Sequence, residues 1–190
     1  RYLNLAIKAA ETPYVCNHDC DILLSNFGLM TSLSYLRNNT AHVVYPYARD
    51  FDSQKRVFRW NAQFPWEPLP AAIMTGDMEP LISGYSVLPW MAAYGHSILF
   101  NRESYISIGG ENESFVSWGA EDLERYQRAI RLGLIVARVD GPVIHLEHAR
   151  NENSSDKNPH FKKNEKNWND IQKMNDEDFR KYCANMEHRK

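Results

Sequence analysis

Short apolar runs alternate with segments of helical periodicity along most of this chain, and this alternation is the strongest constraint on its fold. The apolar runs predict strands over residues 14–17, 42–47, 98–100, 134–139 and 143–146. The periodic segments predict helices over residues 2–10, 22–36, 102–108, 120–132 and 161–182. Because strands that alternate with helices form a sheet with helices packed on it, the pattern predicts an α/β fold.

Two stretches carry more specific expectations. Asp21 would cap the helix over residues 22–36. Its inward face would consist of apolar residues at helical spacing, namely Leu23, Phe27, Met30, Leu33 and Leu36. Residues 49–89 hold five prolines and two tryptophans, and we expect a long irregular excursion or a weak hairpin around Val57–Trp60.

Composition narrows the class of protein. A net charge of −2 and a pI near 6.4 give no electrostatic basis for binding nucleic acid. No apolar run reaches the length of a transmembrane segment, and no signal peptide opens the chain. Three cysteines cannot all pair with one another, which favours a reducing compartment. We therefore expect a cytoplasmic protein of one domain, or one and a part, with peripheral contact to the inner membrane face as an option.

Two aspartates, Asp19 and Asp21, follow the first predicted strand. On an extended segment their side chains would point to the same side, where oxygen ligands suit a hard divalent cation. A cation there could neutralise charge on a departing diphosphate. Two alternatives stay open. One is a solvated turn with a helix cap, and the other is a zinc site on the opposite face, made by Cys16, His18 and Cys20.

A second pair of carboxylates, Glu121 and Asp122, stands at the start of a predicted helix, shortly after Trp118 and Gly119. The helix dipole lowers the cost of keeping both ionised, and an ionised carboxylate can take a proton from an attacking hydroxyl. Trp118 could stack on a sugar ring, and the small residue Gly119 would let a substrate approach the backbone. The alternative interpretation is a pair of ordinary capping acids.

Two histidines, His145 and His148, stand at the end of the last predicted strand. They are three apart, so they do not match the spacing of zinc proteases. Imidazole nitrogens added to carboxylates would favour Mn²⁺ over Mg²⁺. The alternative is two half-buried histidines at a strand end.

In combination, these motifs resemble the catalytic domain of GT-A nucleotide-sugar glycosyltransferases. Residues 95–158 are similar to the C-terminal galactosyltransferase region of the β-1,4-galactosyltransferases and of bacterial chondroitin-polymerase-type enzymes. The segments that carry the resemblance are Asp19–Asp21, Gly95–Phe100, Ile108–Gly110, Trp118–Asp122 and His145–Arg150.

The resemblance implies a role for each motif residue. The metal ligands would be Asp21, His148 and, as a further ligand or a bystander, His145. Asp19 would contact the donor nucleotide, and Asp122 would be the catalytic base. The residues that contact the sugar would be Glu121, Trp118 and Gly119. Ala120 stands where the family usually has glycine.

The resemblance also implies an architecture, a GT-A fold with a mixed central sheet flanked by helices. The catalytic domain would cover residues 1–160, and a helical extension residues 161–190. In this fold the strands that hold the uridine precede the Asp19–Asp21 motif, so either the chain lacks its N-terminal strands or its base pocket comes from elsewhere. We expect the exposed sheet edge to cause self-association.

The implied activity is that of an inverting, metal-dependent hexosyltransferase in polysaccharide biosynthesis, galactosyl- or N-acetylhexosaminyl-transferring. The donor would be a UDP-sugar, the acceptor a carbohydrate hydroxyl, and the cofactor Mn²⁺ or Mg²⁺. Two other functions stay open: a non-catalytic carbohydrate-binding or regulatory domain, and a metal-dependent hydrolase of a phosphodiester or nucleotide-sugar.

Overall fold

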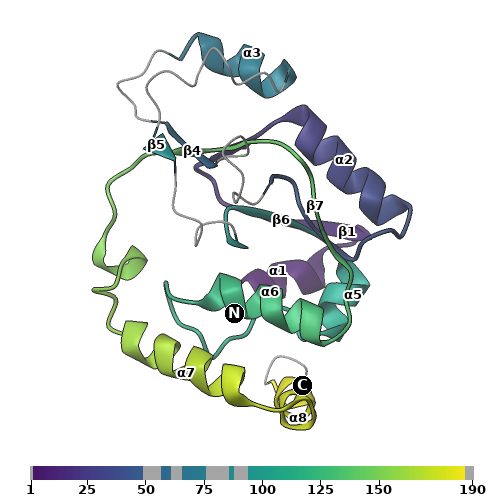
Figure 1. Ribbon diagram of the computed structural model, residues 1–190, viewed down its shortest axis with the longest axis vertical. Coiled ribbons are helices and arrows are strands. Elements are labelled where there is room, and N and C mark those ends of the chain that lie inside the picture. The colour runs from purple at the N-terminus through teal and green to yellow at the C-terminus, as the bar shows by residue number, and fades with distance from the viewer. Residues whose placement is uncertain (1, 49–56, 61–65, 76–85, 88–93, 187–190) are drawn as a thin grey trace. The chain divides into compact units, whose positions relative to one another are not determined.

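A computed structural model describes residues 2–48, 57–60, 66–75, 86–87 and 94–186, which fold into helices and short strands (Figure 1). The chain divides into two compact units. The first unit comprises residues 1–15, 101–134 and 149–190, and the second comprises residues 16–100 and 135–148. The mixture of helices and mixed sheets confirms the predicted α/β class.

One mixed sheet has the strand order β1-β6-β3-β7 within the described residues. Its strands are β1 (Tyr14–His18), β6 (Ser97–Asn101), β3 (Val43–Tyr45) and β7 (Val136–Arg138). β3 runs antiparallel to β6 and parallel to β7. Every residue of Val43–Tyr45 and of Ile98–Phe100 is buried, which explains why these strands are continuous apolar runs. All four strands lie where the sequence predicts them, with slightly different ends.

A second mixed sheet has the order β2-β8-β4-β5 within the described part of the chain. Its strands are β2 (Ile22–Leu24), β8 (Val143–Leu146), β4 (Val57–Trp60) and β5 (Ser86–Val87). β4 pairs antiparallel with β5, but the helix α3 (Pro68–Thr75) lies between them along the chain, so Val57–Trp60 belongs to the predicted long excursion and not to a short hairpin. This helix was not predicted, and residues 49–56, 61–65, 76–85 and 88–89 lie outside the described residues.

The predicted helix over residues 22–36 is wrong at its start. Ile22–Leu24 is the strand β2, paired with β8, and the helix α2 (Asn26–Arg37) begins only after it. Ser25 caps this helix in place of Asp21, because its hydroxyl accepts a hydrogen bond from the N–H of Gly28 at 3.0 Å. An apolar triplet fits either a strand or a first helical turn, and here pairing with β8 decides.

The buried face of α2 also differs from the predicted one. Gly28, Ser32 and Leu36 are buried, whereas Phe27 and Met30 are 58% and 59% exposed. A Cβ on Gly28 would lie 2.4 Å from the carbonyl oxygen of Pro46. The helix therefore packs through the small residues Gly28 and Ser32, which allow a close backbone approach, and through Leu36, which is buried as predicted.

The first unit is helical. Its elements are α1 (Tyr2–Ala9), α5 (Arg102–Ser107), α6 (Glu121–Arg131), the 3₁₀ turn η2 (Glu152–Ser154), α7 (Phe161–Lys173) and α8 (Asp176–Ala184). The predicted helices over residues 2–10, 102–108 and 120–132 are confirmed as α1, α5 and α6. Among the described helices, none is both long enough and apolar enough to cross a bilayer.

The single helix predicted over residues 161–182 is two helices. Met174 adopts an extended conformation, and Asn175 then caps α8 by accepting a hydrogen bond from the N–H of Asp178 at 2.9 Å. The break lets both helices contribute to one apolar cluster, which contains Ile171 and Phe179. The apolar spacing alone does not reveal the break, because Asn175 is one of several possible capping residues within the run, which also holds Asn164, Asn167, Asn169 and Asp170.

Candidate functional site

The second sheet brings Asp21 together with two histidines. Asp21 immediately precedes β2, and the antiparallel register places Ile22 opposite His145 on β8. The N–H of Leu146 donates a hydrogen bond to the carbonyl of Asp21 at 2.7 Å, which fixes the backbone beside the side chain. His148 follows the end of β8. Strand pairing thus joins an early carboxylate to two late imidazoles.

The spacing of these side chains fits a divalent cation. Nε2 of His148 lies 2.8 Å from Oδ2 of Asp21, and Nε2 of His145 lies 3.6 Å from the same oxygen. Two ligands that are each about 2.1 Å from one ion lie roughly 3.0–3.4 Å apart, so little movement is needed to share a cation. One carboxylate oxygen with two imidazole nitrogens suits Mn²⁺ better than Mg²⁺. His148 is half-exposed, which leaves the cluster open on one side.

A second carboxylate lies behind the buried histidine. Nδ1 of His145 is 3.7 Å from Oε1 of Glu147, and that oxygen is 2.8 Å from Nε of Arg59. Arg59 stands opposite His145 in the parallel pair β4–β8. A carboxylate that accepts a hydrogen bond from a ligating histidine orients the ring and raises its basicity. At 3.7 Å, Glu147 is within ion-pair distance of His145 but beyond that of a hydrogen bond. Sequence analysis missed Arg59, because only the sheet register brings it to this position.

Asp19 does not join this cluster in the way that strand alternation predicts. β1 ends at His18, and the N–H of Ile22 donates to the carbonyl of Asp19 at 3.1 Å. The segment is therefore a turn and not an extended strand through Asp21. Among the described residues, the cluster of possible metal ligands comprises Asp21, His145 and His148, and Asp19 is exposed beside it.

The opposite face of β1 has a different organisation from a zinc site. Sγ of Cys16 and Nδ1 of His18 lie 3.6 Å and 3.0 Å from the hydroxyl oxygen of Ser97. Both side chains thus share one face, as alternation predicts. Within the described part of the chain, however, they form no cluster of metal ligands with Cys20.

The second predicted group of site residues lies in the first unit, in a tight turn at the start of α6. Ser117, Gly119 and Ala120 all have positive φ, at 61°, 135° and 62°. Oε2 of Glu121 accepts a hydrogen bond from the N–H of Gly119 at 2.6 Å and closes the turn. Ala120 occupies the helix N-cap in the left-handed conformation. Glycine adopts this conformation at the least cost, so alanine introduces strain here.

The two carboxylates that follow this turn are electrostatically distinct. Oδ1 of Asp122 lies 2.9 Å from Nη1 of Arg125, and the Asp122 side chain is 39% exposed. Burial raises the pKa of Asp122 above its usual range, and Arg125 opposes this shift. Burial, reinforced by the charge of Asp122, raises the pKa of Glu121 to about 7. A carboxylate with a raised pKa is a stronger proton acceptor, which suits a general base.

Trp118 lies on the exposed side of the same turn. Its indole stacks on the ring of Phe161 from α7, with centroids 5.5 Å apart and planes inclined by 10°. Asn158 donates to the carbonyl of Trp118 at 2.7 Å. Asn164 accepts from the N–H of Val116 at 3.2 Å and donates to its carbonyl at 2.9 Å. Sequence analysis missed both buried asparagines, because an isolated asparagine carries no positional signal.

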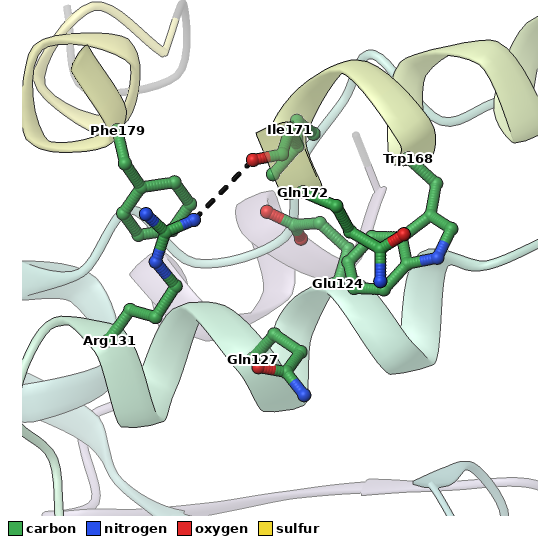
Figure 2. A pocket seen from close by; sticks show the side chains of 7 residues that line it. All are labelled: Glu124, Gln127, Arg131, Trp168, Ile171, Gln172 and Phe179. Carbon is green, nitrogen blue, oxygen red and sulfur yellow. Dashed lines mark hydrogen bonds between the residues drawn. The ribbon is translucent and has the colours of Figure 1, made fainter. Parts of the chain in front are cut away.

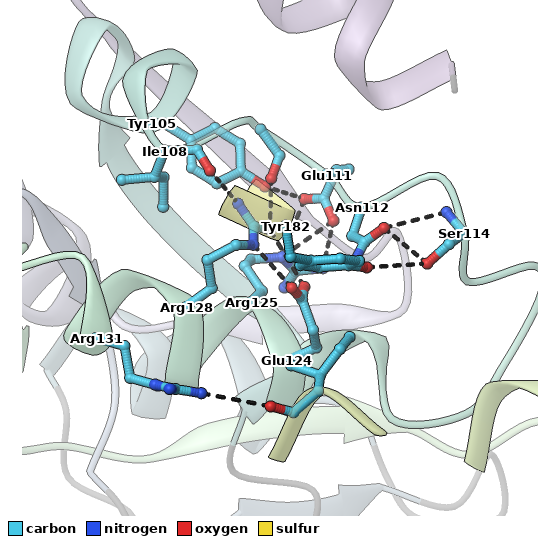
Figure 3. A network of polar contacts seen from close by, with 12 residues as sticks. Tyr105, Ile108, Glu111, Asn112, Ser114, Glu124, Arg125, Arg128, Arg131 and Tyr182 are labelled. Carbon is cyan, nitrogen blue, oxygen red and sulfur yellow. Dashed lines mark hydrogen bonds and ion pairs between the residues drawn. The ribbon is translucent and has the colours of Figure 1, made fainter. Parts of the chain in front are cut away.

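A buried polar network joins α6 to the segment that follows α5 (Figure 3). Arg128 is fully buried, and its Nε lies 2.8 Å from Oε1 of Glu124. It also donates to the carbonyls of Ile108 and Gly110 at 2.8 Å and 2.7 Å. Arg128 therefore connects the Ile108–Gly110 motif, which is part of the family resemblance, to α6. Burial alone would lower the pKa of Arg128, but Glu124 raises it. The four-residue spacing of Glu124 and Arg128 is the sequence signal that could have revealed this pair.

A cavity of about 230 Å³ lies among α6, α7 and α8 (Figure 2). It is lined by Glu124, Gln127, Arg131, Trp168, Ile171, Gln172 and Phe179. Its charged groups already have protein partners. Arg131 donates to the carbonyls of Ile171 and Met174 and lies over the ring of Phe179, and Glu124 pairs with Arg128. None of the predicted site residues lines this cavity, and we assign it no ligand.

Comparison with known proteins supports the resemblance. Residues 86–151 match the family model described as the N-terminal domain of galactosyltransferase. This segment includes Asp122 and both histidines of the cluster, and it does not include Asp21. No curated protein matches the chain. The match indicates a glycosyltransferase, and over residues 86–151 the chain is similar to a galactosyltransferase domain, which confirms the resemblance found in the sequence.

Proposed function

We propose that this protein is an inverting glycosyltransferase of the GT-A type, which moves a sugar from a UDP-sugar to a carbohydrate hydroxyl with Mn²⁺ or Mg²⁺ as cofactor. The observation that supports this best is the convergence of Asp21, His145 and His148 in a chain with a galactosyltransferase-like segment. We propose residues 1–160 as the catalytic portion, with residues 161–190 as an extension that packs against it.

On the donor side, Asp21, His145 and His148 would hold the cation, and Glu147 would orient His145. When bound, the cation supplies positive charge that stabilises the departing diphosphate. Asp19, in the exposed turn just before Asp21, would contact the nucleotide.

On the acceptor side, Asp122 would take the proton of the acceptor hydroxyl as that oxygen attacks the anomeric carbon. Attack from the face opposite the diphosphate inverts the anomeric configuration. The half-exposed indole of Trp118 would stack on a sugar ring, and Gly119 would allow close approach of the substrate. Glu121, whose pKa lies near 7, would hydrogen-bond the sugar as donor or acceptor.

The test is a transfer assay on the full chain with Mn²⁺, using UDP-galactose, UDP-N-acetylglucosamine and UDP-N-acetylgalactosamine, each with and without a panel of saccharide acceptors. Mass spectrometry would identify the product, and proton NMR its anomeric configuration. We expect acceptor-dependent transfer with inversion, lost in Asp21→Ala. Donor cleavage that does not depend on acceptor would favour the hydrolase, and binding without any turnover would favour the non-catalytic domain.

A further inference from the structure

Arg125 bridges two carboxylates in the first unit. It lies one helical turn after Asp122 on α6, and only 5% of its side chain is exposed. Its Nη1 lies 2.9 Å from Oδ1 of Asp122. Its Nε and Nη2 donate to Oε2 of Glu111 at 3.1 Å and 3.0 Å. One guanidinium therefore holds Asp122 at one end and Glu111 at the other.

The far end of this bridge is fixed. The hydroxyl of Tyr105 donates to Oε1 of Glu111 (Figure 3). The backbone of Glu111 pairs with the buried Asn4, which accepts from its N–H at 2.7 Å and donates to its carbonyl at 2.9 Å. Burial would raise the pKa of Glu111, but Arg125 and the Tyr105 hydroxyl lower it. Because Glu111 is held as a carboxylate, it fixes the position of the Arg125 guanidinium.

We propose that Arg125 is a positioning residue for Asp122. It holds Oδ1, which orients the carboxylate so that Oδ2 accepts the proton of the attacking hydroxyl, and its charge keeps the carboxylate ionised. This inference rests on the proposed role of Asp122 as the base. The partly exposed Asp122 is reachable by a substrate, whereas the buried Arg125 is not, so Arg125 acts through the carboxylate.

The charges around Asp122 give this role a measurable consequence. Arg125 contacts it directly, and two carboxyl groups, Glu111 and the adjacent Glu121, act in the opposite sense. An opposite charge at this distance lowers the pKa of a carboxyl group by about 1–3 units. Without Arg125, Asp122 would hold its proton to higher pH, and a base that must be ionised would become active only at higher pH.

The experiment compares the pH dependence of kcat/KM in the full chain, with the donor and acceptor that the transfer assay selects. In Arg125→Met, the acid limb of the kcat/KM profile should move to higher pH by about one unit. The value of kcat should fall, while the KM for the donor stays unchanged. Arg125→Lys keeps the charge and loses the planar fork, so its acid limb should return toward that of the wild type while kcat stays reduced. The matched control is Arg131→Met on the same helix, which removes the same charge and should leave the profile in place.

Arg125→Met leaves the buried carboxylate of Glu111 without its cationic partner, which could prevent folding. A second variant, Glu111→Gln with Arg125→Met, therefore replaces that carboxylate by a neutral amide. Its Asp122 carboxyl can be titrated by carbon-13 NMR without any turnover, with the signal assigned through Asp122→Asn. Because the loss of Glu111 alone lowers the Asp122 pKa, the reference is the single variant Glu111→Gln. An upward shift of the Asp122 pKa from this variant to the double variant supports the proposal. An unchanged pKa between the two, together with an unchanged kcat, would overturn the role of Arg125 and leave Asp122 as the base. Near-native turnover of Asp122→Asn would instead overturn the base itself.

Discussion

A Cβ placed on Gly119 would lie 3.2 Å from Cδ2 of Phe161, at a backbone φ of 135°. The turn before α6 therefore depends on glycine for two separate reasons, the left-handed backbone and the contact with α7. Since Trp118 stacks on the same phenyl ring, a change at Gly119 should also move the indole that is expected to face the sugar.

Gly119→Ala should lower the free energy of unfolding by about 1–3 kcal/mol, because strain and crowding add at this position. Urea unfolding followed by tryptophan fluorescence would measure it. Two other glycines separate the causes. Gly133→Ala has a φ of 85° but open space and should show the strain alone, and Gly141→Ala, with nothing within 4 Å, should be nearly neutral. A Gly119→Ala variant as stable as Gly141→Ala would contradict the prediction.

Mn²⁺ should bind to the wild-type chain, and UDP should strengthen its binding. The double variant Asp21→Ala, His148→Ala removes two of three ligands and should lose most of the affinity. Isothermal titration calorimetry with Mn²⁺, with and without UDP, would measure this. His160→Ala, an exposed histidine outside the cluster, serves as the control. Equal Mn²⁺ affinity in the wild type and the double variant would exclude this site.

Asp122→Asn should lower kcat by about 10²–10⁴-fold, because an amide cannot take the proton of the acceptor. Binding of the UDP-sugar should stay nearly unchanged, and calorimetry would measure it alongside steady-state kinetics. If Asp122 serves only to support the first turn of α6 through its contact with Arg125, the folded Asn variant should keep near-native turnover. Near-native turnover of the Asn variant would therefore remove Asp122 from the mechanism.

Glu121 should make the stability of the protein depend on pH. Burial and the charge of Asp122 raise its pKa from 4.5 to about 7, so the folded chain holds this proton more tightly than the unfolded chain. The resulting stability is fully present below the unfolded value and is lost as the pH rises through about 7.

Glu121→Gln should remove this pH dependence and still accept the hydrogen bond from Gly119. Compared with the wild type, the variant should gain stability as the pH rises from 4.5 to about 7, with no further gain above that, which thermal unfolding across this range would show. Glu165→Gln, at an exposed position on α7, should follow the wild type. Parallel stability curves for the wild type and Glu121→Gln would show that the pKa of Glu121 is not raised in the folded state.

Arg128→Met should cost about 3–5 kcal/mol of unfolding free energy, because it leaves the buried Glu124 carboxylate without its partner. The double variant Glu124→Leu, Arg128→Met should lose less than the two single variants combined, since it strands no charge. Urea unfolding of all four proteins completes the cycle. Lys166→Met, which breaks an exposed pair of the same spacing, should have little effect. Additive losses in the cycle would mean that the two side chains are not coupled.

The sequence predicts those elements whose signals are local. Val143–Leu146 and Ile98–Phe100 are short apolar runs, and each is a buried strand. Ile22–Leu24 is equally apolar but adjoins a helical pattern, so only its partner strand, far along the chain, decides its conformation. The same is true of α2, where the carbonyl of Pro46 selects a face of small residues.

Some residues of the candidate site could likewise be predicted from the sequence, whereas others are brought together only by the fold. The motifs around Asp21, Asp122 and His148 are visible as short patterns and through the family resemblance. Arg125 and Glu111 are not, because their contact depends on the turn after α5 meeting a particular side of α6. Asn164 is hidden for the same reason, since its side chain satisfies backbone groups of a turn far away in the sequence.

The pairing of β2 with β8 has one more consequence, which concerns folding. Asp21 lies on one side of a long closed segment of chain, and His145 and His148 lie on the other. A cation shared by them would act as a reversible cross-link between two stretches of polypeptide that are far apart in the sequence. Because such a ligand binds only the folded chain, the melting temperature would rise with the concentration of Mn²⁺ and drop on chelation, a reporter of occupancy that needs no sugar at all.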